Sequence, residues 1–233
     1  MILTPEERTK VGEAWIKAGI DEHASIVSFS RFILHLLSLG APPDLLRDAI
    51  RAMGDEVEHA SLCFGIAKQI TGDAIGPDNM DISDIMAKHT DIKGILEAAI
   101  VEGCLGETFA AHSATFAQKM VGEPSLKNIL SKIAEDEMRH ADLSWRFVEW
   151  VMETKPDLHT FVEHVFNQKL KEFAALQDLQ ENNASKVARL ESSDNEALLE
   201  RFGHLSTASR HHVIQKALKE VIKPRMAVML KIV

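Results

Sequence analysis

Two copies of one short phrase constrain the fold of this chain more than any other feature. The phrase DEVEHA fills residues 55–60, and DEMRHA fills residues 136–141, which lie 81 positions later. Both copies read Asp-Glu-x-x-His-Ala within stretches whose apolar spacing is helical. Side chains three residues apart on a helix share one face. Each copy therefore presents a glutamate and a histidine side by side.

The two phrases belong to a larger internal repeat. Glu22 precedes Glu56 by 34 residues, and Glu102 precedes Glu137 by 35 residues. Each half then offers one glutamate on a first helix and Glu-x-x-His on a second. The repeat predicts two helical hairpins that form a pseudo-symmetric four-helix bundle.

The remainder of the chain also has a helical pattern. Thr4-Pro5-Glu6-Glu7 is a helix start signal with a capping box. No segment shows the strict alternation that a half-buried strand requires, so the predicted fold class is all-α. Helices are expected over about residues 5–39, 43–70, 92–120 and 124–154, after residue 156, and from about residue 207. We expect a bundle over residues 1–154 and a C-terminal helical extension over residues 155–233.

Composition limits the partners and the cellular location. A net charge of −9 disfavours nucleic acid as a partner, because phosphate binding needs a basic surface. The longest apolar stretch, ASIVSFSRFILHLLSLG, contains Arg31 and His35 and is too short to cross a bilayer, so no membrane partner is expected. The opening MILTPEERTK lacks the apolar run of a signal peptide, and two cysteines cannot form a disulfide framework. A cytoplasmic protein is the expectation.

The buried faces of the four helices carry ionisable residues that need partners. A desolvated carboxylate without a partner is very costly. Two divalent cations would satisfy the whole set, and carboxylate with imidazole suits iron or manganese. The predicted ligands are Glu22, Glu56, His59, Glu102, Glu137 and His140.

The third-helix ligand and the role of the two aspartates each have an alternative interpretation. Glu107 competes with Glu102, but it lies about 140° away around an ideal α-helix, and the repeat favours Glu102. Asp55 and Asp136 precede the two Glu-x-x-His units. They are expected to accept hydrogen bonds from histidines on the facing helix and so to support the metal ligands without binding the metal themselves. The alternative is that both aspartates are solvated surface residues.

One Glu followed by Glu-x-x-His, twice on four helices, resembles the ferritin-like di-iron carboxylate superfamily. The resemblance covers about residues 5–154. It implies a ferritin-like bundle with two iron ions, or a Mn/Fe pair. It also implies that Glu56 and Glu137 bridge the metals, with Glu22 and Glu102 as terminal ligands.

The resemblance leaves several functions open. A tyrosyl-radical role is disfavoured because the chain has no tyrosine. The leading hypothesis is an O₂-activating oxidase or oxygenase that acts on a small organic substrate with an external electron donor. Its apolar pocket would include residues such as Phe29, Phe109 and Phe147. The alternatives are a ferroxidase, an iron-binding or peroxide-detoxifying protein without an organic substrate, and a bundle whose metals are structural. The extension either shapes a substrate pocket or builds a homodimer interface.

Overall fold

The computed structural model describes residues 3–83, 91–187 and 193–231. Every regular element in these residues is a helix, which confirms the predicted all-α class. None of the helices in this described part combines the length and the hydrophobicity that a bilayer crossing requires.

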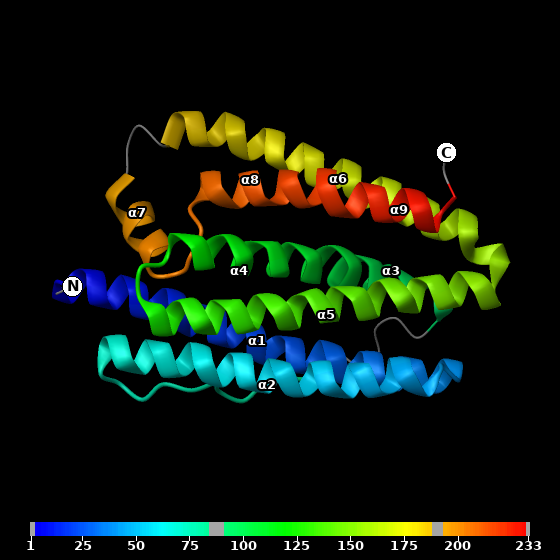
Figure 1. Ribbon diagram of the computed structural model, residues 1–233, viewed down its shortest axis with the longest axis horizontal. Helices are drawn as coiled ribbons and strands as arrows, with labels where there is room; N and C mark the ends of the chain where they lie inside the picture. The colour runs from blue at the N-terminus through cyan, green and yellow to red at the C-terminus, as the bar shows by residue number, and fades with distance from the viewer. Residues whose placement is uncertain (1–2, 84–90, 188–192, 232–233) are drawn as a thin grey trace.

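Four helical rods run alongside one another and form the bundle (Figure 1). The first hairpin consists of α1 (Pro5–Leu39) and α2 (Pro43–Thr71). The first rod of the second hairpin is continuous but changes its helix type, from α3 (Ile92–Ala98) through the π-helix η1 (Ala99–Glu107) to α4 (Thr108–Met120). Its second rod is α5 (Pro124–Thr154). Within the described residues of these four rods, η1 departs from the regular α-helix that was expected.

Local sequence signals set the ends of these rods. The Thr4 hydroxyl accepts a hydrogen bond from the Glu7 amide, and the Glu7 carboxylate accepts one from the Thr4 amide, which is the predicted capping box. Gly40 ends α1 in the left-handed conformation with φ 65°, where a side chain would be strained. The tight turn that follows keeps α1 and α2 in register along their length.

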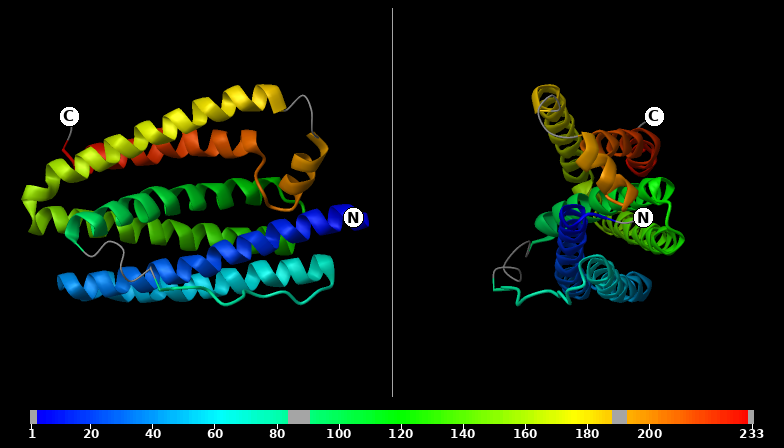
Figure 2. Two further views of the ribbon diagram at one scale, coloured as in Figure 1. Left: turned by 180° about the vertical axis from the view of Figure 1, so that it is seen from behind. Right: turned by 90° about the vertical axis from the view of Figure 1, so that its left-hand side faces the viewer.

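The C-terminal extension forms a further layer on one side of the bundle (Figure 2). It comprises the 3₁₀ turn η2 (Pro156–Leu158), α6 (His159–Val187), α7 (Ser193–Arg201), α8 (Thr207–Ala217), the π-turn η3 (Leu218–Ile222) and α9 (Lys223–Met229). Helix α8 packs on α4, and α7 contacts both α1 and α4. The extension therefore covers the third rod, and it also contacts α5 through Phe166 and Arg225.

The π-helix η1 lies unusually close to α5. A Cβ atom at Gly103 would overlap the side chain of Ser144, which is itself 4% exposed. Only glycine allows this approach, and the approach brings the carboxylates of η1 towards those of α5. Small residues at this contact therefore position part of the candidate site.

We expect Gly103→Ala to lower the free energy of unfolding by about 1–3 kcal/mol, because the added methyl group overpacks the contact with Ser144. Gly65→Ala on α2 is the matched control, since its Cβ would meet nothing within 4 Å. That control should be neutral or stabilising by up to about 1 kcal/mol. Urea denaturation followed by circular dichroism measures both, and equal effects would contradict the close-packing argument.

Candidate metal centre

Six side chains from four helical rods converge at the centre of the bundle. They form two groups of four that share two members. One group is Glu22, Glu56, His59 and Glu137, and the other is Glu56, Glu107, Glu137 and His140. Within each group, the atoms that can bind a metal lie within 4.8 Å of one another. Because Glu56 and Glu137 belong to both groups, each can contact two neighbouring cations.

Within the described part of the chain, several buried nitrogen and oxygen atoms of this cluster have no hydrogen-bond partner. Glu56, His59, Glu137 and His140 are each at most 3% exposed. The Nδ1 atoms of the two histidines lie 3.1–3.8 Å from carboxylate oxygens. In the described residues, however, neither these nitrogens nor Oε2 of Glu56 and Glu137 has a hydrogen-bond partner. Each such buried orphan costs about 1–3 kcal/mol. Cations between the two groups would remove that cost, so the residues present fit a two-metal site.

Each aspartate of the duplicated phrase reaches across to the histidine of the other copy. Nε2 of His59 lies 3.0 Å from Asp136 Oδ2, and Nε2 of His140 lies 3.3 Å from Asp55 Oδ2. When each Nε2–H donates a hydrogen bond to its aspartate and the ring is neutral, the lone pair of Nδ1 can bind a cation. The crossed arrangement therefore orients both imidazoles towards the cluster.

Basic residues that the sequence analysis did not single out support the two aspartates. Nη2 of Arg139 donates to Asp55 at 3.0 Å and to Asp136 at 2.6 Å, and Nζ of Lys132 donates to Asp136 at 2.8 Å. Burial alone would raise the pKa of Asp136, but Lys132, His59 and Arg139 outweigh it and lower the pKa to about 2. Asp136 is thus ionised whenever it faces His59.

The protonation of the metal-free cluster follows from burial and close contacts. Burial raises the pKa of Glu22 to about 7, and it raises that of Glu107 well above the ordinary range. Burial would also raise the pKa of Glu56 and Glu137, but both histidines outweigh it and lower these values. Two carboxyl groups therefore hold protons while two are ionised.

The histidines of the metal-free cluster are cationic. Burial would lower their pKa, but the surrounding glutamates raise that of His140 to about 9 and that of His59 further. Two imidazolium ions thus offset the ionised Glu56 and Glu137. Metal ions that enter must displace these protons.

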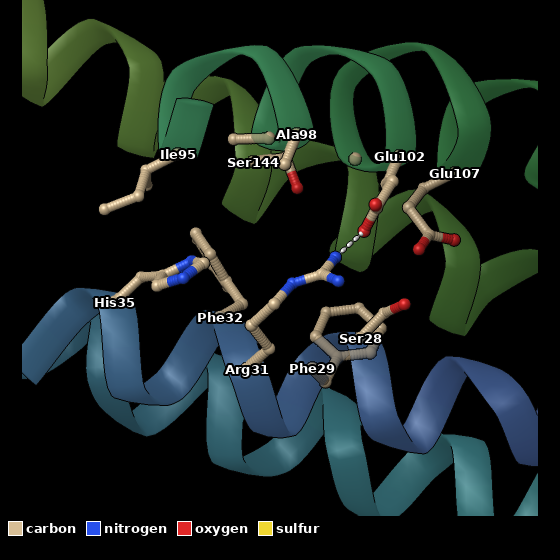
Figure 3. A pocket seen from close by; sticks show the side chains of 12 residues that line it. Ser28, Phe29, Arg31, Phe32, His35, Ile95, Ala98, Glu102, Glu107 and Ser144 are labelled. Carbon is tan, nitrogen blue, oxygen red and sulfur yellow. Dashed lines mark hydrogen bonds and ion pairs between the residues drawn. The ribbon is translucent and has the colours of Figure 1, made fainter. Parts of the chain in front are cut away.

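The structure brings Glu107, and not Glu102, into this cluster. Glu102 pairs instead with Arg31 of α1, with Nη2 of the arginine 2.5 Å from Oε2 of the glutamate (Figure 3). The expected choice of Glu102 assumed an ideal α-helix, but both residues lie in the π-helix η1. Because π-helical hydrogen bonds join residues five apart, Glu102 and Glu107 lie near one face, one turn apart.

A sequence signal for this change of helix type is present but weak. The segment VEGCLGE carries two glycines, Gly103 and Gly106, which disfavour a regular α-helix. Glu102 lies 80 residues after Glu22, close to the 81 residues that separate Glu56 from Glu137, whereas Glu107 lies 85 residues after Glu22. The regular spacing of the repeat therefore selects Glu102 and does not hold within this π-helix.

A cavity of about 410 Å³ opens onto the cluster. Glu22 and Glu137 lie in its wall, together with Cys63 and Phe109. Burial raises the pKa of the Cys63 thiol, so Cys63 is a neutral part of the wall. The C-terminal extension adds a wall to this cavity with Gly203, His204, Leu205, Arg210 and Ile214.

The other two aromatic residues expected in a pocket lie elsewhere. Phe29 lines a separate hollow of only about 40 Å³ beside Arg31, room for about three water molecules (Figure 3). Its ring also contacts His140, with the ring centroids 5.1 Å apart. Phe147 is fully buried in the core against Phe32. Of the three residues, Phe109 lines the 410 Å³ cavity.

Comparison with known proteins places the chain in a family. Residues 100–221, just over half of the chain, match the fatty acid desaturase family. The matched segment includes Glu107, Glu137 and His140, whereas Glu22, Glu56 and His59 precede it. No curated protein and no solved structure matches the chain. The match over residues 100–221 shows that this chain belongs to the fatty acid desaturase family.

Proposed function

We propose that this protein is a di-iron oxidase that uses O₂ to desaturate an organic substrate with an acyl-like chain. The observation that carries the proposal is the six-residue cluster with a cavity opening directly onto it. The family match supports the reaction class, since it is to fatty acid desaturases. The substrate class rests on that match and on the apolar cavity wall.

The metal ligands in this proposal are Glu22, Glu56, His59, Glu107, Glu137 and His140. Iron is favoured by the oxygen and imidazole donors, and a Mn/Fe pair has the same ligand preferences. When bound, the metals supply the activation of O₂ that a protein side chain cannot. Asp55 and Asp136 hold the histidines in the orientation that ligation needs.

The residues of the chain position the substrate and exclude water. The cavity wall next to Glu22 and Glu137 is apolar, with Ala114, Ile133 and Phe109. Overall, desaturation removes two hydrogen atoms from adjacent carbons and reduces one O₂ to two waters. Two further electrons come from an external donor, and two protons come from solvent. The apolar side chains of this wall limit the contact of the reacting carbon atoms with water.

A ferroxidase or peroxide-detoxifying protein would use the same cluster but needs no organic substrate. The 410 Å³ cavity lies within the range of small-molecule sites and therefore favours the desaturase. Kinship with ferritin-like proteins is part of our proposal, on the strength of the duplicated ligand pattern. Cytoplasmic location and homodimerisation stay predictions.

The test is turnover by iron-loaded protein supplied with O₂, a chemical or flavoprotein reductant and a series of fatty acids. We expect a product lighter by two hydrogen atoms, seen by mass spectrometry, with O₂ consumption that depends on the substrate. Protein that oxidises Fe(II) and accumulates iron while leaving every acyl compound unchanged would instead support the ferroxidase.

Ligand variants distinguish Glu107 from Glu102. We expect Glu107→Gln to bind about one iron per chain fewer than the wild type, because it removes a donor from one of the two groups. Glu102→Gln is the matched control and should keep full iron content, because Glu102 pairs with Arg31. Iron per folded chain, measured by elemental analysis after anaerobic loading, decides between them, and the reverse pattern would restore Glu102 as the ligand.

Metal loading should release protons. At pH 6 the protonated groups of the cluster are Glu22, Glu107, His59 and His140, so we expect about four protons per chain on complete loading. Iron affinity should therefore fall as pH falls. Titration in weak buffer with a pH indicator measures the release, and loading without proton release would refute this protonation pattern.

A further inference from the structure

A hollow of about 700 Å³ lies on the outer side of the candidate metal centre, between α2, α5 and the last helices. Arginines and carboxylates line it in equal number, four of each, so charge alone selects no ligand for it. Asp55, Arg139 and His140 belong to its lining, and their side chains are 15%, 38% and 2% exposed, in that order. Solvent in the hollow therefore meets Arg139 and Asp55 before it reaches the histidine.

Arg139 is held in one orientation by three acceptors. Its Nη1 donates to the backbone carbonyl of Glu135 at 3.2 Å, one turn earlier on α5. Its Nη2 donates to Asp136 at 2.6 Å and to Asp55 at 3.0 Å. Both N–H groups of this one nitrogen are thus used, one for the aspartate of each His–Asp pair. Because the guanidinium group is planar and rigid, a single side chain connects the outer supports of both histidines.

The two histidines belong to different halves of the cluster. We call the group Glu22, Glu56, His59 and Glu137 the His59 subsite, and the group Glu56, Glu107, Glu137 and His140 the His140 subsite. Behind His59, Asp136 accepts from Lys132 at 2.8 Å as well as from Arg139, and its side chain is 6% exposed. Asp136 therefore has two basic partners and little contact with solvent, so Lys132 still holds it when Arg139 is removed.

The support behind His140 depends on Arg139. Asp55 has no second lysine or arginine partner among the residues that the structure describes. Nε2 of His140 lies 3.3 Å from Asp55, whereas the matching distance behind His59 is 3.0 Å. Without Arg139, water from the hollow would hydrate Asp55 and compete for this hydrogen bond. An imidazole that loses its outer partner turns more freely, and such losses typically weaken metal binding about 10- to 100-fold.

We propose that Arg139 is a positioning residue on which metal binding in the His140 subsite depends, while the His59 subsite depends on it little. It acts through Asp55, which keeps Nε2–H of His140 engaged so that Nδ1 faces the cluster, and it separates this contact from the solvent of the hollow. The inference rests on the proposed function for the metal ions. It goes further by making the two subsites unequal, because removal of one side chain outside the ligand set leaves one ion firmly bound and the other weakly bound.

Metal titration tests this inference without turnover. Metal-free protein is titrated anaerobically with Fe(II), and bound iron is measured after equilibrium dialysis. We expect Arg139→Gln to bind the first iron within about threefold of the wild-type affinity and the second about 10- to 100-fold more weakly. Arg139→Lys keeps the charge and N–H donors but loses the planar fork, so it should recover part of this loss.

Arg146→Gln is the matched control. Arg146 lies on the same helix, lines the same hollow and also pairs with two aspartates, Asp48 and Asp142. Its side chain is 34% exposed, which is close to the value for Arg139. None of its ion pairs in the described ranges involves either His–Asp pair. Both iron affinities should therefore equal those of the wild type. Circular dichroism confirms that each variant is folded.

Nitrogen NMR of zinc-loaded protein separates positioning from a general loss of stability, because it identifies the ring nitrogen that binds the metal. We expect Nδ1 to be bound in both His59 and His140 of the wild type. In Arg139→Gln with one zinc per chain, we expect this signature for His59 alone. A merely structural role of Arg139 would lower the unfolding temperature and leave the wild-type pattern in place.

Two results would overturn the inference. One is wild-type affinity for the second iron in Arg139→Gln, and the other is equal weakening by Arg139→Gln and Arg146→Gln, which would indicate a general effect of charge. Wild-type protein that binds less than one iron per chain would refute the proposed function as well. A second iron that depends on Arg139, without turnover of any acyl compound, would support the inference and count against the desaturase activity alone.

Discussion

The convergence of four glutamates and two histidines in the bundle core is the constraint on which the rest of the structure depends. Burial disfavours each charge by itself, so the set is stable only when its members neutralise one another or bind cations. In the metal-free protein, protons on Glu22 and Glu107 and on both histidines achieve this balance. Metal ions bound by these six residues would replace the protons and would link the four rods.

Residues around the cluster hold its side chains in position. Asp55 and Asp136 cross between α2 and α5 to reach the opposite histidines, and Arg139 contacts both aspartates. These contacts fix the imidazole rings from outside the cluster. The π-helix η1 acts from the other side, because its altered register places Glu107 at the shared carboxylates. A π-helix inside an otherwise regular helix often marks a functional site.

The C-terminal extension gives the candidate metal centre an adjoining cavity. The 410 Å³ cavity lies between α1, α4 and α5 of the bundle and the wall that residues 203–214 add. A bundle of four helices alone would leave this face of α4 open. The same cluster of ligands can therefore serve iron handling or substrate oxidation, depending on what covers the bundle. Here the covering wall includes His204, Leu205 and Arg210.

The sequence by itself determined the helical class, the ends of the main helices and five of the six clustered side chains. These follow from local rules, since capping and the spacing of three within Glu-x-x-His depend only on nearby residues. Tertiary structure alone decided between Glu102 and Glu107, because the π-helix accompanies a close contact between Gly103 and Ser144, 41 positions apart. It also decided the cavity, since His204 meets Trp15 only when the extension folds back onto α1. Contacts between distant parts of the chain have no local signature, so spacing alone does not reveal them.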